Sequence, residues 1–197
     1  MQFYRDQVVS PLGLLIAVWV EPGMLCALDY DGSERLTKLC HRYHDIELSD
    51  LSQRTLPKPI GHALIRYFEG DLTCLTEVAV WHGGSSLEQA VWSELRRIPP
   101  GETLSYGQVA ARIGRPTACR AVGRVNASNP VSIVVPCHRV VGAGGALTGY
   151  SGGLARKAWL LAHETSQVNE RPPLTLGATT SSPQRSYSHP PVKSVLS

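Results

Sequence analysis

The pattern of apolar residues changes at the segment Gly83-Gly84-Ser85-Ser86. Before it, short runs of β-branched and aromatic residues alternate with turns that contain Pro and Gly, which is typical of strands. After it, apolar residues recur every three or four positions, which is typical of helices that bury one face. We therefore expect a strand-rich unit over residues 1–85 and a helical unit over residues 86–165, joined by a linker.

In the first unit, the pattern predicts a hairpin or meander with extended runs over 1–9, 14–20 and 24–30. Helices are expected over 33–43 and 60–68, where apolar residues fall four positions apart. A further strand is expected over residues 74–81.

In the second unit, an apolar stripe predicts a first helix that ends at Pro99-Pro100-Gly101. Two short helices, over 106–113 and from 117 to about 126, flank a Gly-Arg-Pro turn, and this pattern resembles a helix-turn-helix. An extended buried run over 131–135 precedes a glycine-rich loop and a last helix over 154–163.

From residue 166 onward, 15 of 32 residues are Pro, Ser or Thr and no apolar period is visible. Such a segment buries too little surface to offset its ordering entropy, so we expect a disordered tail over 166–197. The apolar run at 12–20 is shorter than the roughly 18–20 residues of a membrane span, and it lacks the basic flank of a signal peptide. Five scattered cysteines favour a reducing compartment. A cytoplasmic protein is therefore expected.

The net charge of +3 hides an asymmetry. Residues 1–85 hold seven basic and eleven acidic side chains, whereas residues 86–165 hold nine basic and four acidic ones, and all but one of these nine are Arg. An arginine-rich half suits docking to a polyanion such as DNA. An ordinary solvated surface that happens to be basic is the alternative.

Cys137 stands in Pro136-Cys137-His138-Arg139, between an apolar run and the glycine-rich loop. A thiolate is the nucleophilic form of cysteine, so a reactive cysteine needs a base or a positive charge beside it. For an arbitrary Cys-His pair, a buried and inert thiol is the plainer interpretation.

The surroundings of Cys137 change this interpretation. The string Val-Val-Pro-Cys-His-Arg-Val-Val over residues 134–141 resembles the active-site signature of the O6-alkylguanine-DNA alkyltransferases. The similarity spans residues 86–165 in order and spacing. It also includes Gly101-Glu102-Thr103, Ser105-Tyr106-Gly107, Arg120-Ala121-Val122-Gly123, Asn129-Pro130, Gly149-Tyr150-Ser151-Gly152-Gly153 and Leu160-Leu161.

The resemblance implies a fold of class α/β plus α. Its N-terminal part would be a ribonuclease-H-like unit with an antiparallel sheet, and its C-terminal part a helical, winged-helix-like domain with a helix-turn-helix that enters the minor groove. In this family an arginine fills the space left by an extruded nucleotide, and Arg120 stands at that position. The small side chains of Ala118 and Ala121 would let the helix approach the DNA backbone, and Arg115 and Gly123 complete the expected DNA-binding set.

The resemblance also implies direct DNA repair by a single-use methyltransferase. The protein would flip O6-alkylguanine, or O4-alkylthymine, out of double-stranded DNA and move the alkyl group to Cys137. His138 would take the thiol proton through a water, and Glu164 would orient His138. The expected substrate-binding residues are Tyr106, Val140, Ser151 and Asn129. A monomer without metal or organic cofactor is expected, in the cytoplasm or nucleoid of a bacterium or the nucleus of a eukaryote.

Two other functions and one other site are compatible with parts of the sequence. A non-catalytic helix-turn-helix regulator would explain the basic half but not the Pro-Cys-His-Arg string, and a Cys-His hydrolase would need an oxyanion loop that nothing here resembles. Zinc could bind Cys40, His41 and His44, with Cys26 and Cys74 as further ligands, although surface histidines and buried thiols explain these residues better. The sequence departs from the family at Leu87-Glu88, where a Phe-Gln pair is usual, and at Cys119, where a small residue is usual.

Overall fold

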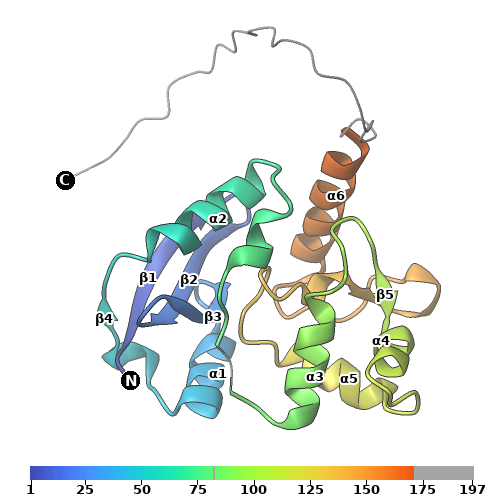
Figure 1. The fold of residues 1–197 in the computed structure, drawn as a ribbon, viewed down its shortest axis with the longest axis horizontal. Helices are drawn as coiled ribbons and strands as arrows, with labels where there is room; N and C mark the ends of the chain where they lie inside the picture. The colour runs from blue at the N-terminus through green and yellow to red at the C-terminus, as the bar shows by residue number, and fades with distance from the viewer. Residues whose placement is uncertain (82, 171–197) are drawn as a thin grey trace, which may run out of the picture.

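The computed structural model describes residues 1–81 and 83–170 (Figure 1). Three antiparallel strands form a meander: β1 (Phe3–Ser10), β2 (Gly13–Val20) and β3 (Met24–Tyr30). The short β4 (Ser52–Gln53) pairs with β1 in parallel, so the sheet is mixed and has the order β3-β2-β1-β4. The three predicted strands are confirmed.

Helices cover both faces of this sheet. Leu15, Ala17 and Trp19 of β2 share a core with α2 (Lys58–Phe68), whereas Ile16 and the other alternate residues share a second core with α1 (Glu34–His44). Because successive side chains of a strand point to opposite faces, a strand covered on both sides is apolar throughout. This explains the continuous apolar run that β2 shows in the sequence.

The C-terminal half is mainly helical. It contains α3 (Ser86–Leu95), α4 (Tyr106–Arg112), α5 (Cys119–Ala127) and α6 (Leu154–Glu170), and β5 (Leu104–Ser105) pairs in parallel with β6 (Val140–Val141). The helices α3, α4 and α5 pack against one another. Four short 3-10 helices complete the described elements: η1 (Leu48–Asp50), η2 (Cys74–Glu77), η3 (Cys137–Arg139) and η4 (Ala143–Gly145).

One large core crosses the boundary between the halves, because it contains residues of the sheet, of α2, of α3 and of α6. At this boundary the edge of β3 binds the segment that leads to Cys137. The amide of Leu28 donates to the carbonyl of Pro130 at 2.9 Å, and the amide of Ser132 donates to the carbonyl of Leu28 at 2.8 Å. The strand-rich half therefore fixes the segment that carries the candidate nucleophile.

Three predictions about local structure need correction. Of the strand predicted over 74–81, Val80 does pair with Leu25 of β3, but residues 74–77 form a 3-10 helix. Cys74, Leu75 and Val78 are the buried positions there, and this spacing is helical. The buried run over 131–135 is extended only at its start, where Val131 pairs with Leu28 of β3, and it then turns at Ile133, whose φ is 72°. The last helix continues beyond residue 163 to Glu170, so residues 166–170 are helical, and the rest of the predicted tail lies outside the described residues. No helix in the described part of the chain is long and apolar enough to cross a membrane.

Candidate active site

Cys137 opens the short helix η3 directly after Pro136, and its side chain is buried. Asn126 of α5 donates to the Cys137 carbonyl at 3.2 Å. The Asn129 amide group donates to the carbonyl of Val135 at 2.8 Å and accepts from the amide of Val131 at 3.0 Å. Asn126 thus ties α5 to the turn that carries the thiol, and Asn129, which was expected to bind substrate, holds the segment between α5 and that turn.

The carboxylate of Glu164, on α6, accepts hydrogen bonds from His138 and from the groups around it. Its Oε1 accepts from the His138 Nε2 at 2.9 Å, and both side chains are fully buried. Arg139 donates to both oxygens of the same carboxylate, at 2.8 and 2.9 Å, and its Nη1 donates to the carbonyl of Ile98 at 2.5 Å. The Gly101 amide donates to Oε2 at 3.3 Å. A buried carboxylate with this many donors is held rigidly in its charged form.

The electrostatics of the network fix its protonation. Burial alone would raise the pKa of Glu164, but His138 and Arg139 hold it well below its usual range. Burial lowers the pKa of His138 more than Glu164 raises it. A neutral imidazole beside a carboxylate donates through Nε2, so its lone pair lies on Nδ1, which has no hydrogen-bond partner among the described protein atoms. His138 is therefore poised to accept a proton.

The thiol of Cys137 is unreactive in this state. Burial raises its pKa, although a hydrogen bond with Asn129 and the charges of Arg35 and Lys157 oppose the shift. The thiol is thus protonated near neutral pH, and reaction requires a base to remove its proton.

The loop after β6 is held by a lysine that the sequence analysis did not single out. The buried Nζ of Lys157 donates to the carbonyls of Val140 and Thr148, at 2.5 and 2.6 Å. Lys157, Leu160 and Glu164 share the buried face of α6. Two charged residues on an otherwise apolar helix face are unusual, and this pattern in the sequence could have identified Lys157 as a functional residue. The lysine thus ties β6 to the middle of the glycine-rich loop over residues 142–153.

Tyr106 and Ser151, both predicted to bind substrate, lie at this loop. The Tyr106 hydroxyl is 3.5 Å from the carbonyl of Thr148, and a Cβ at Gly123 would lie 3.8 Å from the Tyr106 ring. Ser151 is exposed and Val140 is buried. Because Gly123 belongs to α5, it brings the Tyr106 ring and the predicted DNA-binding helix into contact.

Tyr30 and Tyr150, to which the sequence analysis gave no role, pack against the glycine-rich loop at Gly152. The Tyr30 hydroxyl of β3 lies 3.2 Å from that of Tyr150, and a Cβ at Gly152 would overlap both rings. Burial raises the pKa of Tyr30 to about 12. Only a glycine fits at position 152, which explains that part of the glycine-rich motif.

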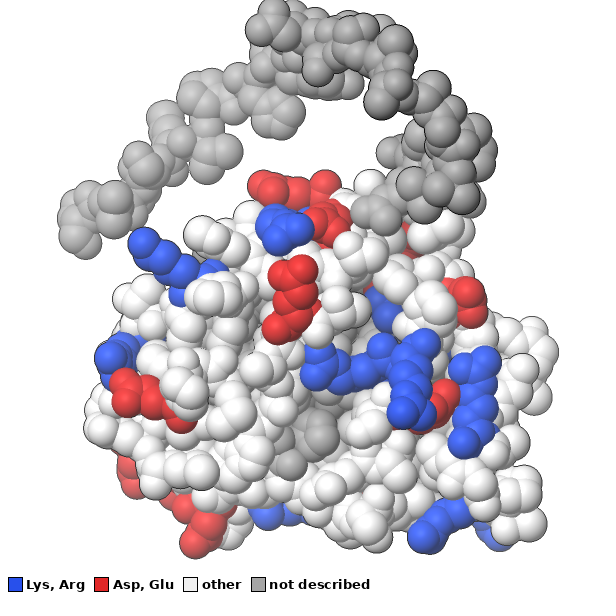
Figure 2. All heavy atoms as spheres, in the orientation of Figure 1, with Lys and Arg blue, Asp and Glu red and all other residues white. Residues whose placement is uncertain are grey.

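The predicted DNA-binding residues lie on or just before α5. Arg115, in the turn between α4 and α5, and Arg120 are exposed, whereas Ala118, Ala121 and Gly123 are half-buried. Figure 2 shows basic side chains gathered over the C-terminal half, around one acidic group. Arg97 and Arg112 both pair with Glu94, at 3.3 Å each. The α4–α5 region therefore presents exposed arginines, namely Arg112, Arg115, Arg120 and Arg124.

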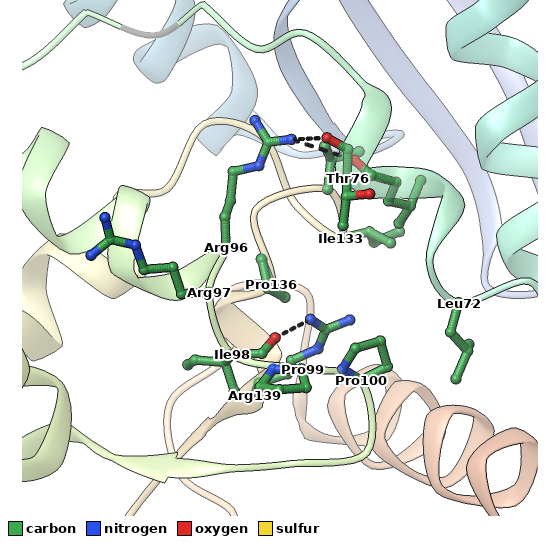
Figure 3. Close-up of a pocket in the computed structure, with 12 residues that line it drawn as sticks. Leu72, Thr76, Arg96, Arg97, Ile98, Pro99, Pro100, Ile133, Pro136 and Arg139 are labelled. Carbon is green, nitrogen blue, oxygen red and sulfur yellow. Dashed lines mark hydrogen bonds between the residues drawn. The ribbon is translucent and has the colours of Figure 1, made fainter. Parts of the chain in front are cut away.

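A cavity of about 220 Å³ borders the other side of the Cys137 turn (Figure 3). Pro136 and Arg139 lie at this turn, and Leu72 closes the cavity from the N-terminal half. Figure 3 shows Arg96 reaching across it to the carbonyl of Thr76, at 3.1 Å. None of the predicted substrate-binding residues lines this cavity.

The departure at Glu88 has a structural role. Its carboxylate completes a capping box with Ser85 at the start of α3 and accepts from Tyr43 and Arg42 of α1, at 2.7 and 2.8 Å. Glu88 thus joins the two halves at a point away from the thiol.

The candidate zinc ligands do not lie together. Cys26 and Cys40 are buried, and burial raises the pKa of each thiol to about 12. His41 pairs with Glu47 at 3.1 Å instead. Within the described ranges, no three metal-ligating side chains lie close enough together to hold an ion.

Comparison with known proteins places this geometry in a family. The DNA-binding domain of 6-O-methylguanine DNA methyltransferase matches residues 86–166. A methylated-DNA–protein-cysteine methyltransferase of Shigella flexneri is 41% identical over 165 residues, which make up 83% of this chain and 96% of that protein. One of Mycolicibacterium paratuberculosis is 55% identical over 98 residues, 50% of this chain and 59% of that protein.

Solved structures of the same family are also similar to this chain. The O6-methylguanine methyltransferase of Mycobacterium tuberculosis superposes with a TM-score of 0.73 at 36% identity, covering 84% of this chain and 94% of that one. Its complex with DNA gives a TM-score of 0.72 at 36% identity, covering 85% and 94%. With its buried thiol and the His138–Glu164 pair beside it, this chain belongs to the methylated-DNA–protein-cysteine methyltransferase family.

Proposed function

We propose that this protein repairs DNA by transferring the alkyl group of O6-alkylguanine, and of O4-alkylthymine, irreversibly to its own Cys137. The observation that carries the proposal is the buried Cys137 next to a histidine whose Nε2 is held 2.9 Å from Glu164 in a chain of this family. This is the nucleophile, base and orienting group that covalent catalysis requires.

The reaction follows from the protonation of the network. His138 takes the thiol proton at Nδ1, through a water, while Glu164 holds the imidazole through Nε2. The thiolate Sγ attacks the alkyl carbon, an S–C bond forms, and the C–O6 bond breaks with its electron pair on the oxygen. The proton finally neutralises the leaving purine, so thiol and alkylguanine give thioether and guanine. Tyr106, Val140 and the Ser151 loop hold the base and stabilise its developing charge.

DNA recognition is assigned to the α4–α5 pair, used as a helix-turn-helix of winged-helix type in the minor groove. Arg120 occupies the space of the flipped nucleotide, since its guanidinium can stack and donate hydrogen bonds in place of the lost base. Arg115, Ala118, Ala121 and Gly123 shape the same surface. The protein acts on double-stranded DNA as a monomer and has a ribonuclease-H-like N-terminal half. It works in the cytoplasm or nucleoid if its source is a bacterium, and in the nucleus if its source is a eukaryote.

Mass spectrometry after incubation with duplex DNA containing O6-methylguanine tests the proposal. We expect Cys137 to gain the mass of one methylene group, and the Cys137→Ser variant to gain nothing while still binding DNA. A hydroxyl ionises far less readily than a thiol, and phosphate contacts do not involve this atom. DNA binding without any modification would instead identify the non-catalytic regulator.

A further inference from the structure

Glu164 receives a hydrogen bond from the strand-rich half of the molecule. Tyr67 lies in the last turn of α2, is fully buried, and donates its hydroxyl to Glu164 Oε1 at 2.8 Å. The same oxygen accepts from His138 and from Arg139. Tyr67 therefore acts on the atom that orients the imidazole.

The position of Tyr67 is fixed by a second contact with α6. The carbonyl of Tyr67 accepts from His163 Nε2 at 2.8 Å, and the Tyr67 ring meets the rings of His163 and Phe68 edge-on, with centroids 5.3 Å away in each case. Because His163 precedes Glu164, two consecutive residues of α6 are bound to one residue of α2. The hydroxyl thus has little freedom to leave the carboxylate.

We propose that Tyr67 is a positioning residue for the alkyl transfer, whose hydroxyl shares the Glu164 oxygen that accepts from His138 and so sets how strongly the carboxylate holds the imidazole. The inference rests on the proposed roles of Cys137 and His138. It gives the strand-rich half a part in the reaction itself, because the phenol donates to the oxygen that accepts the imidazole N–H.

The direction of the effect follows from the shared oxygen. A phenol that donates to Oε1 draws charge from it and weakens its pull on the His138 N–H. Without the phenol, the carboxylate stabilises the imidazolium more strongly, so the pKa of His138 rises. The other charged or titratable groups facing this cluster are Arg139, Lys157, Cys137, His163 and Tyr30. A Tyr67→Phe substitution leaves all of them in place.

The test is the rate of Cys137 alkylation by free O6-benzylguanine, measured against pH in the full chain. The base must be neutral to accept the thiol proton, so the rate falls on the acid side of the His138 pKa. For Tyr67→Phe we expect this acid limb to move to higher pH by roughly 0.5 to 1 unit, which is about a threefold to tenfold loss of rate on the limb. The NMR titration of the His138 ring should move in the same direction.

Tyr43→Phe is the matched control, because the Tyr43 hydroxyl also donates to a largely buried carboxylate, that of Glu88, at 2.7 Å. It removes the same hydrogen bond outside the site and should leave the pH profile unchanged. In a Glu164→Gln background, Tyr67→Phe should produce no further shift. A Tyr67→Phe profile that is lower at every pH but not displaced would overturn the inference and leave Tyr67 a purely structural role. If the unsubstituted protein is not alkylated at all, the proposed function fails instead.

Discussion

Glu164 is the side chain on which most of the site depends, because it binds two residues of the active-site turn, one residue of α2 and the backbone at Gly101. Its pKa is lowered in the folded protein, so its interactions stabilise the fold at pH values above its unfolded pKa of about 4.3. This stabilisation is lost as the pH falls from there toward the lowered value.

Glu164→Gln should therefore destabilise the protein strongly at neutral pH and much less in acid. The substitution leaves Arg139 buried without its counter-charge, and breaking such a pair costs about 3–5 kcal/mol. Urea unfolding of both proteins between pH 7 and pH 3 measures the difference. The difference in the free energy of unfolding between the two proteins should become smaller below pH 4. A difference that stays constant with pH would contradict the assignment of the stabilisation to an ionised Glu164. The variant should also react more slowly with both duplex DNA and free O6-benzylguanine.

Arg120→Ala should slow repair of O6-methylguanine in duplex DNA but not the reaction with free O6-benzylguanine. The exposed guanidinium is assigned to the space of the flipped base, and a free base needs no flipping. The loss should correspond to about 1–3 kcal/mol, since unstacking a base costs a few kcal/mol. The readout is the alkylation rate of Cys137 with each substrate. Equal slowing with both would mean that Arg120 supports the pocket.

Among the helices and strands, those marked by a pattern of apolar residues within their own segment could be predicted from the sequence. The strands of the meander and the helices α1, α2, α4 and α5 are found within a few residues of their predicted ends, since each is an amphipathic or doubly buried run. Cys137 and His138 could be assigned because the contiguous string over residues 134–141 resembles the family signature, whereas their adjacency alone favoured an inert thiol. Tyr67 and Lys157 were missed because their partners lie on other elements, and nothing local distinguishes a tyrosine in an apolar helix from an ordinary core residue.

The extension of α6 leads to a prediction about truncation. Val168 packs against Gly101, and the side chain of Gln167 lies against Gly70 in the loop after α2. Removal of residues 171–197 should leave the stability nearly unchanged, as the composition of that segment predicts. Removal of residues 166–197 should lower it by about 1 kcal/mol or more, through the lost apolar contact. Thermal unfolding of the two truncated proteins compares them directly, and identical melting temperatures would show that the extra turns contribute nothing.

Across the whole molecule, charge is divided between the halves, with the exposed arginines of the α4–α5 region on the basic side. Binding to duplex DNA should therefore depend steeply on salt and little on sequence. Each phosphate that an arginine neutralises releases counterions, so the logarithm of the affinity falls in proportion to the logarithm of the salt concentration. Fluorescence anisotropy with two unrelated duplexes across a salt series measures both properties. A flat response to salt would assign the basic half to another partner.

The burial of Cys137 also limits its reaction with electrophiles and oxidants other than the alkylated base. A group that reacts once and is never regenerated is wasted whenever a stray electrophile or oxidant reaches it first. With 1% of its surface exposed and its pKa raised, Cys137 is shielded from such reagents. Cys119, which is exposed beside Arg120, is not. Brief treatment with iodoacetamide should thus label Cys119 well before Cys137 and leave the reaction of Cys137 with free O6-benzylguanine intact. The packing that lowers the reactivity of the free thiol therefore also preserves the thiol until an alkylated base binds.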